Sequence, residues 1–272
     1  METAEAMKIT LAHIETSLGD PRGLWAAKEY PHQLTILDKL MNYLIGYTCD
    51  GSVARRSIRL FKGIDSTDQI SFSSWNETRA ASLKDIREVL CLAGATCDTW
   101  ELAVTIKDFL QNLFDTLGYC DIDDDIQETE LNTYLDQLQG KPDSWEKGAI
   151  TPFRPAYASW LRKKARAPGE NVLPEPALMY LKYLLGKTRY APFDYHSEKV
   201  LTRLGLMTRE TPHQIKKNIY NQFVGVDKPV SKHRKLVEFS KIICLERQPR
   251  CGLCPVRTSC HYSQKISGSS PS

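Results

Sequence analysis

The segment from Cys244 to Cys260 reads CLERQPRCGLCPVRTSC, and it holds four of the chain's eight cysteines. The spacing is Cys244-x6-Cys251-x2-Cys254-x5-Cys260. Four thiols so close together indicate a set of metal ligands. Zinc usually takes two close pairs separated by a longer loop, whereas a compact loop that wraps one cluster suits a [4Fe-4S] cubane better. The segment therefore predicts an iron-sulfur cluster loop, with zinc as the alternative.

Three arginines stand between these cysteines: Arg247, Arg250 and Arg257. Four thiolates around an oxidised [4Fe-4S] core leave a net negative charge, which positive side chains in the loop would offset. The other cysteines are scattered, and Cys91 stands in the apolar run 89–92, where a free thiol behaves as a small hydrophobe. We expect Cys91 in the core and no disulfides, because a reducing compartment disfavours them.

The composition is that of an ordinary globular protein. The chain has 272 residues, 36 Lys and Arg against 33 Asp and Glu, 42% hydrophobic and 25% charged residues, which excludes disorder, collagen and a coiled coil as its main state. No stretch approaches the roughly 18 apolar residues of a membrane helix, and residues 1–15 lack the basic-then-apolar order of a secretory signal. We expect an intracellular protein without a membrane partner. A net charge of +3 is too small to indicate a polyanion partner by itself.

Apolar side chains recur at helical spacing along most of the chain. Strand-like alternation is scarce, so the predicted fold class is all-α. The apolar stripes are Leu37, Leu40, Met41, Leu44 and Ile45; Leu83, Ile86, Leu90 and Ala93; and Leu102, Ile106, Phe109, Leu110 and Leu113. Four further helices are expected at Ala177–Leu185, Ser197–Leu206, Pro212–Phe223 and His233–Leu245.

Changes in composition divide the chain into five parts. We expect an N-terminal extension with little helix at 1–33, a helical subdomain at 34–116, an inserted region at 117–176, a second helical subdomain with the cysteines at 177–262, and a disordered tail at 263–272.

The inserted region combines an acidic run with a basic segment. The acids of residues 121–130 lack the glycine and the terminal glutamate of a calcium loop, so a solvated helix start is favoured. The basic segment holds Arg154, Arg162, Lys163, Lys164 and Arg166, with Phe153, Tyr157 and Trp160 among them. This mixture suits phosphate contacts combined with base stacking, and a solvated helix face is an equally weighted alternative.

Two motifs give the chain a specific resemblance to a known family. The cysteine spacing and the segment RQPRCGLCP (247–255) are similar, nearly residue for residue, to the cluster loop of the endonuclease III family of helix-hairpin-helix DNA glycosylases. The segment FDYHSEKV (193–200), followed by RLGL (203–206), resembles that family's Val-Asp-Thr-His-x-x-Arg-Val…Arg-Leu-Gly-Leu. The resemblance covers about residues 34–116 and 177–262. It implies two helical subdomains flanking a cleft for DNA and a flipped base, with a C-terminal [4Fe-4S] loop whose arginines lie near phosphates.

By this resemblance, Asp194 is the catalytic aspartate. Breaking an N-glycosidic bond builds positive charge on the sugar, and a nearby carboxylate stabilises that charge or activates a water to capture it. The structural alternative is a helix N-cap, a common role for Asp before a helix.

Similarity to the family extends upstream to the segment 44–53. It resembles the family's turn whose polar side chain fills the gap left by a flipped base, and Tyr47 occupies its Gln position. Tyr47 would either wedge between bases or pack in the core, and these two interpretations are equally weighted. Arg55, Arg56 and Arg59 follow on a helix and would meet the phosphate backbone.

The chain departs from the family at the hairpin. Counting back from Asp194 places the family's nucleophilic lysine near Glu175, where no amine is available to form a Schiff base. The two-glycine turn that binds phosphate is also missing from residues 169–177. A displaced hairpin at residues 138–141 would make Lys147 the lysine, but it requires a long insertion before Asp194.

These observations predict a monofunctional DNA glycosylase of base-excision repair. It would bind double-stranded DNA as a monomer, flip out a damaged or modified base, and hydrolyse its N-glycosidic bond. In a prokaryote it would be found in the cytoplasm or nucleoid. Two alternatives stay open: a non-catalytic iron-sulfur protein that binds nucleic acid, and a bifunctional glycosylase and lyase that uses Lys147.

Overall fold

The computed structural model describes residues 9–14, 34–49, 51–65, 72–96, 98–118, 121–123, 126–138 and 172–267. These residues form helices and connecting turns but no β-strand, so the predicted all-α fold is confirmed. None of the described helices is long and apolar enough to cross a membrane. Lys147 and the basic segment with Arg162, Lys163 and Lys164 lie outside the described residues.

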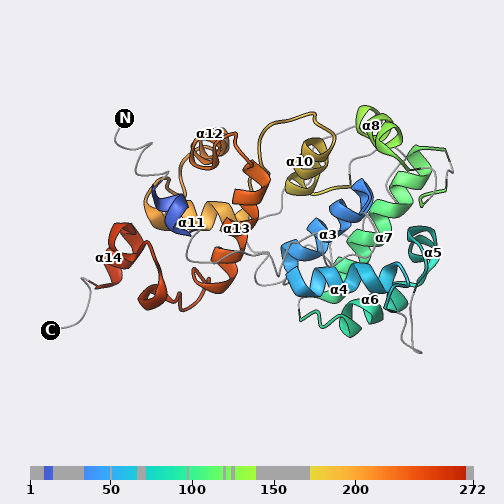
Figure 1. The fold of residues 1–272 in the computed structure, drawn as a ribbon, viewed down its shortest axis with the longest axis horizontal. Helices are drawn as coiled ribbons and strands as arrows, with labels where there is room; N and C mark the ends of the chain where they lie inside the picture. Colours follow the sequence, from blue (N-terminus) through green and yellow to red (C-terminus); the bar gives the residue numbers. More distant parts are fainter. Residues whose placement is uncertain are drawn as a thin grey trace. The chain divides into compact units, whose positions relative to one another are not determined.

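Figure 1 follows the helices along the chain. They are α3 (Ile36–Thr48), α4 (Gly51–Phe61), α5 (Trp75–Ala80), α6 (Leu83–Leu92), α7 (Thr99–Thr116), α8 (Glu128–Gln137), α10 (Glu175–Leu184), α11 (Tyr195–Leu204), α12 (His213–Val224), α13 (Pro229–Ile242) and α14 (His261–Ser267), with short 3-10 turns η2 (Cys251–Leu253) and η3 (Arg257–Ser259). The chain divides into two compact units. Residues 24–187 form one, called the large unit below; residues 188–272 and 1–23 form the other, called the cysteine unit.

The large unit is built on the apolar stripes predicted from the sequence. The α3 and α7 stripes are buried completely, and the α6 stripe is buried except for its first residue. Thr35 begins α3 with a capping box: its hydroxyl accepts the N–H of Asp38 at 3.1 Å, and the Asp38 carboxylate accepts the N–H of Thr35 at 3.0 Å. The same carboxylate accepts the indole N–H of Trp75 at 2.8 Å, which ties α5 to α3.

Helix α10 belongs to the large unit. Its Tyr180 stacks on Tyr43 of α3 with ring centroids 4.4 Å apart, and both rings are buried. The compact unit therefore ends at Lys187, whereas the sequence pattern placed the second subdomain from residue 177 onward.

One acid of the predicted acidic run has a structural role instead of facing solvent. The Asp123 carboxylate accepts the backbone N–H groups of Trp75 and Asn76, each at 2.9 Å, and the Lys62 ammonium at 3.0 Å. Burial by itself would raise the pKa of Asp123, but these three donors outweigh it and lower the pKa below its usual value. Asp123 thus caps the first turn of α5 from a distant part of the chain.

Cys91 is exposed, so the prediction of a core thiol was wrong. Helix α6 buries Ile86, Val89 and Leu90, and Cys91 follows on the face that these residues leave open. Consecutive residues of a helix point in different directions, so the four apolar residues 89–92 cannot all lie on its one buried face.

The core of the cysteine unit includes the N-terminal segment. Residues 9–14 are helical, so the prediction of little helix in the N-terminal extension was wrong for this stretch. Leu11 and Ile14 lie in the same hydrophobic cluster as Phe223 of α12 and Phe239 of α13. Their spacing of three places both on one helix face, a stripe too short to stand out before Gly19 and Pro21.

Helix α11 ends at the Arg-Leu-Gly-Leu motif. Gly205 has a φ of +86°, which L side chains rarely adopt, and a Cβ there would lie 3.0 Å from the Cβ of His261. The glycine therefore lets α11 end directly against α14. Because α14 continues to Ser267, the prediction of a disordered tail from residue 263 was wrong for residues 263–267. On α12, Lys216 is 4% exposed and donates to Glu198 of α11 at 2.7 Å and to the Arg209 carbonyl at 3.0 Å. This pair holds α12 against α11.

Candidate active site and cysteine pocket

Asp194 is the N-cap of helix α11. Its backbone is extended, with φ −135° and ψ 176°, and its Oδ1 accepts the backbone N–H and the hydroxyl of Ser197, both at 2.8 Å. This is the usual way in which Asp satisfies an unpaired N–H in the first turn of a helix. The Asp194 side chain is 0% exposed. Capping occupies only one of its two carboxylate oxygens.

The second oxygen of Asp194 faces a histidine. Oδ2 is buried without a hydrogen-bond partner, and the Nε2 of His233 lies 3.4 Å from it. The Nδ1 of the same ring lies 2.7 Å from the Tyr220 hydroxyl and 3.5 Å from the Ser197 hydroxyl. His233 and Tyr220 are both 0% exposed. Residues from α11, α13 and α12 thus form one buried polar chain, called the Asp194 chain below.

Burial decides the charge of His233. It lowers the pKa of His233 below its ordinary value against the opposing effect of Asp194, and Arg234 lowers it further. Burial also raises the pKa of Tyr220 well above its ordinary value, so the hydroxyl keeps its proton. A neutral imidazole has one N–H, and a carboxylate only accepts. The tautomer with its proton on Nε2 suits both neighbours best, because it turns an N–H toward the carboxylate and leaves Nδ1 free to accept from Tyr220.

A second set of buried polar contacts joins α11 to α13. The Nδ1 of His196 lies 3.1 Å from the Ser240 hydroxyl, and the Lys199 ammonium donates to the Ser240 carbonyl at 3.2 Å. Burial lowers the pKa of Lys199 to about 8. These contacts hold the first turns of α11, and with them Asp194, against α13.

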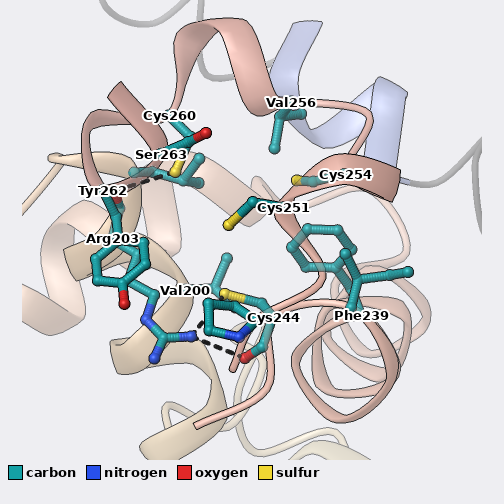
Figure 2. Close-up of a pocket in the computed structure, with 13 residues that line it drawn as sticks. Val200, Arg203, Phe239, Cys244, Cys251, Cys254, Val256, Cys260, Tyr262 and Ser263 are labelled. Atoms are coloured by element: carbon teal, nitrogen blue, oxygen red, sulfur yellow. Dashed lines mark hydrogen bonds between the residues drawn. The ribbon is translucent and has the colours of Figure 1, made fainter. Parts of the chain in front are cut away.

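The four predicted cysteine ligands lie around one pocket within the cysteine unit (Figure 2). They are Cys244 after α13, Cys251 in η2, Cys254 directly after η2, and Cys260 before α14. Their sulfur atoms face a common space, and apolar side chains that include Val200, Phe239 and Val256 line it. All four are free thiols. Among the described residues, no three His, Cys, Asp or Glu side chains are arranged to hold a single metal ion.

Arg203 is the cation in direct contact with these cysteines. Its guanidinium donates to the sulfur of Cys244 at 3.3 Å and to the carbonyl oxygen of Cys244 at 3.1 Å (Figure 2). It also donates to the carbonyl oxygens of Leu245 and Glu246 at 2.6 and 2.9 Å. It also lies over the ring of Tyr262, 4.8 Å from the centroid. Arg203 opens the Arg-Leu-Gly-Leu motif, but no local pattern marks it as a partner of the cysteines.

Two thiols of the pocket, those of Cys251 and Cys254, favour their protonated form. Burial raises the pKa of Cys251 and of Cys254, and the neighbouring cysteines add to the effect. Four thiolates this close would repel one another, so they ionise together only when a bound cation neutralises them.

The residues predicted to contact DNA differ in their surroundings. Tyr47 is 5% exposed, with its ring 6.4 Å from that of Tyr43, so it is packed in this structure. Arg59 donates two hydrogen bonds of 2.6 Å to Asp65. Arg56 is exposed and Arg55 is half-buried. The arginines of the cysteine loop, Arg247, Arg250 and Arg257, are exposed.

Comparison with known proteins finds similarity in structure. No family model and no curated protein matches the sequence. A thermostable thymine-DNA glycosylase is similar at 15% identity and a TM-score of 0.56, over 97% of this chain and 100% of that one. Two complexes of endonuclease III with DNA, one a trapped covalent intermediate and one non-covalent, are similar at 14% identity and TM-scores of 0.58 and 0.59, over 98% and 99% of this chain and 100% of each. The chain has the helix-hairpin-helix DNA glycosylase fold.

At such low sequence identity, the structural similarity establishes the fold alone. The reaction must therefore be argued from the residues. Near residue 175, where counting back from Asp194 places the family's hairpin lysine, the structure has the start of a helix. Pro174 is the N-cap of α10 and Glu175 is its first residue, where the resemblance places a lysine.

Proposed function

We propose that this chain is a DNA glycosylase that removes a damaged or modified base from double-stranded DNA by hydrolysis and leaves the strand intact. The observation that carries the proposal is the place of Asp194 in a chain with the glycosylase fold. It begins α11 in the segment that resembles the family's aspartate motif, and its Oδ2 is not used by the cap. A carboxylate oxygen in a buried site stabilises a developing cation more strongly than it would in water.

The proposed reaction starts from a nucleotide flipped out of the duplex. The bond between C1′ and the base breaks with its electron pair moving to the base, and positive charge develops on the sugar. Oδ2 of Asp194 stabilises this charge. Water then adds to C1′ and gives up a proton, and the departing base gains one. The products are a free base and an abasic site.

Access to Asp194 must change when DNA binds. The side chain is 0% exposed, so a flipped nucleotide reaches Oδ2 only after the groups that cover it have moved. We therefore expect binding and opening of the site to precede the chemical step.

Strand cleavage is not part of the proposal. A lyase step needs an amine that forms a Schiff base with the sugar. The residue at the expected position is Glu175, a carboxylate, which forms no imine.

The four cysteines around the pocket would hold a [4Fe-4S] cluster. A zinc ion binds thiolates at about 2.3 Å, which puts its four sulfurs only about 3.8 Å apart, and the described side chains show no such convergence. A cubane places four iron atoms between its ligands, so it fits thiols spread around a shared pocket. When bound, the cluster would link the C-terminal end of α13 to the start of α14, and it would supply a redox-active group. Arg203 would donate a hydrogen bond to one of the ligand sulfurs.

The distribution of charge supports DNA as the partner. Residues 188–272 hold 15 Lys and Arg against 6 Asp and Glu, whereas residues 1–187 hold 21 against 27. The small net charge of the whole chain therefore hides a strongly basic C-terminal part, suited to phosphate contacts. We assign the cysteine loop arginines, together with Arg55 and Arg56, to such contacts, and propose that the protein binds duplex DNA as a monomer. We therefore expect the protein to be located with the DNA of the cell.

The experiment that tests the proposal is an excision assay on purified full-length protein. Duplexes would carry uracil or thymine opposite guanine, 8-oxoguanine, dihydrothymine or 5-methylcytosine, and each reaction would be analysed with and without alkali. Strand breaks that appear only after alkali indicate a glycosylase without lyase activity. Breaks without alkali, together with an adduct trapped by borohydride and lost in Lys147→Ala, would establish the bifunctional alternative.

A second candidate function is a non-catalytic iron-sulfur protein that binds nucleic acid. The complete burial of the Asp194 side chain and the packed position of Tyr47 favour it. Tight binding to every duplex with no product from any of them would support this candidate instead of the glycosylase.

A further inference from the structure

We propose that Tyr220 and His233 position the Asp194 carboxylate for base excision. The inference rests on the proposed function and adds to it two residues that lie between the two quoted motifs of the resemblance, residues 193–206 and 244–260, and belong to neither. Neither residue touches the substrate in this account. Both act through Asp194, and they are therefore positioning residues.

The helix cap does not fix the rotation of the Asp194 carboxylate about its Cβ–Cγ bond. Ser197 holds Oδ1 with two hydrogen bonds of 2.8 Å, but a carboxylate held at one oxygen still turns about its Cβ–Cγ bond. His233 Nε2, 3.4 Å from Oδ2, is the group that faces the second oxygen. An N–H at this place favours one orientation of the carboxylate and leaves a lone pair of Oδ2 directed elsewhere.

Tyr220 in turn fixes the orientation and tautomer of His233. Its hydroxyl lies 2.7 Å from Nδ1, the short distance of a good hydrogen bond. With the proton on Nδ1, the lone pair of Nε2 would face a carboxylate oxygen, and two acceptors would repel each other. A hydroxyl that donates to Nδ1 therefore keeps the proton on Nε2, directed at Asp194.

A neutral histidine suits the proposed chemistry better than a charged one. The glycosyl cation is stabilised by the negative charge of Asp194, which an adjacent imidazolium would partly cancel. The groups that face the ring from the described helices include Asp194 and Ser197 of α11 and Tyr220 of α12, with Arg234 next to it on α13. Complete burial and this arginine both oppose protonation. His233 thus orients the carboxylate and leaves its charge intact.

Helix capping alone does not call for this arrangement. A serine at position 194 would satisfy the N–H of Ser197 equally well and would bury no charge. The protein instead buries a carboxylate with an unbonded oxygen and places a histidine and a tyrosine behind it. Such a combination is unfavourable for stability, which indicates that it serves the chemistry of the site.

The first test compares Tyr220→Phe with Tyr134→Phe in the full-length protein. Tyr134 is the matched control, because it is also 0% exposed and its hydroxyl donates to Asn112 at 2.9 Å within the large unit. The single-turnover excision rate is measured on the duplex that the wild type processes in the assay above. Affinity is measured with a duplex that carries a tetrahydrofuran abasic analogue.

We expect Tyr220→Phe to lower the excision rate about tenfold, the effect of one hydrogen bond that acts on the transition state, with unchanged affinity. Tyr134→Phe should lower only the melting temperature. Equal excision rates for the two variants would overturn the inference.

The second test uses His233. His233→Gln keeps one donor and one acceptor, whereas His233→Leu removes both, so we expect the glutamine variant to retain more of the excision rate than the leucine variant. A leucine variant as active as the wild type would contradict the positioning role.

Nitrogen-15 NMR of the ring gives a readout that does not depend on activity. We expect His233, identified by the signals lost in His233→Gln, to be neutral with its proton on Nε2 at pH near 7. A charged ring or a proton on Nδ1 would overturn the inference even in an active enzyme. If the wild type excises no base, the proposed function fails, while this spectrum still decides the geometry of the Asp194 chain.

Discussion

The two oxygens of Asp194 have different neighbours, which allows the residue to combine a helix cap with the proposed catalytic role. Oδ1 is bound twice by Ser197 and begins α11, while Oδ2 faces His233 without a hydrogen bond. The sequence motif and the chemistry of the reaction led to this aspartate. They did not lead to His233 or Tyr220, because the contacts of the Asp194 chain join three helices, and no local pattern marks a side chain whose partner lies on another helix.

Substitutions at Asp194 should separate capping from charge. Asparagine caps a helix about as well as aspartate, whereas alanine loses the acceptor. Asp194→Ala should lower the free energy of unfolding by about 1–2 kcal/mol, and Asp194→Asn by less than half of that. Urea denaturation followed by circular dichroism measures both values. Equal losses in the free energy of unfolding for the two variants would show that the hydrogen bond from the Ser197 N–H to residue 194 does not stabilise the helix.

His233 should make stability depend on pH in one direction. Its pKa is lowered in the folded protein, so between that value and about 6.5 the unfolded chain binds a proton that the folded one does not. The free energy of unfolding is therefore highest above about pH 6.5 and falls as the pH drops, by at most about 1.4 kcal/mol per pH unit for this one group. His233→Gln should flatten the slope between about pH 7 and pH 5. An unchanged slope in urea titrations across this range would show that His233 is protonated in the fold.

At the scale of elements, the sequence predicts helices well where one face is continuous. The structure agrees to within a few residues with the predicted stripes of α3, α6 and α7 and with the predicted spans of α10 to α13. Side chains at this spacing can all be buried together only if the segment is a helix. The helix at 9–14 was missed because it shows only Leu11 and Ile14. Cys91 was wrongly predicted to be buried, because an apolar run in the sequence does not show which of its residues face the core. Asp123 was taken for a solvated acid because the N–H groups it caps lie far away in the sequence.

The α5 cap gives a test at this scale. Asp123→Ala removes the acceptor for the N–H groups of Trp75 and Asn76 and leaves Lys62 without its carboxylate. We expect a loss of about 1–3 kcal/mol in the free energy of unfolding. Asp136→Ala, an exposed change near the end of α8, should stay within about 0.5 kcal/mol of the wild type. If the two variants are equally stable in urea denaturation, Asp123 does not hold α5.

At the scale of the whole molecule, charge and cysteines gather in one unit. Residues 188–272 contribute the excess of basic side chains, the four cysteines of the pocket and the Asp194 chain. The spacing of the cysteines predicted that they belong together, and the structure brings them around one pocket. It also shows that Arg203 donates to the sulfur of Cys244. The sequence does not indicate this contact, because it depends on where α11 ends relative to Cys244.

Replacing any one of the four pocket cysteines should show whether a metal group holds this unit together. We expect Cys251→Ser to lose the iron, the brown colour and at least about 5 °C of melting temperature, because a bound cluster contributes its binding energy to folding. Cys91→Ser is the matched control, since Cys91 is exposed and lies outside the pocket. Iron and sulfide analysis of both proteins measures the outcome. Zinc in place of iron, or full iron in Cys251→Ser, would contradict the cluster assignment.

Base release from the panel of duplexes, measured for the wild type and for Asp194→Asn, decides whether Asp194 is the catalytic carboxylate of a glycosylase. We predict that the wild type converts at least one duplex to a product cleaved only by alkali, and that Asp194→Asn binds the same duplex but forms that product at least about a hundredfold more slowly. Excision by Asp194→Asn at the wild-type rate would contradict the assignment of the catalytic carboxylate.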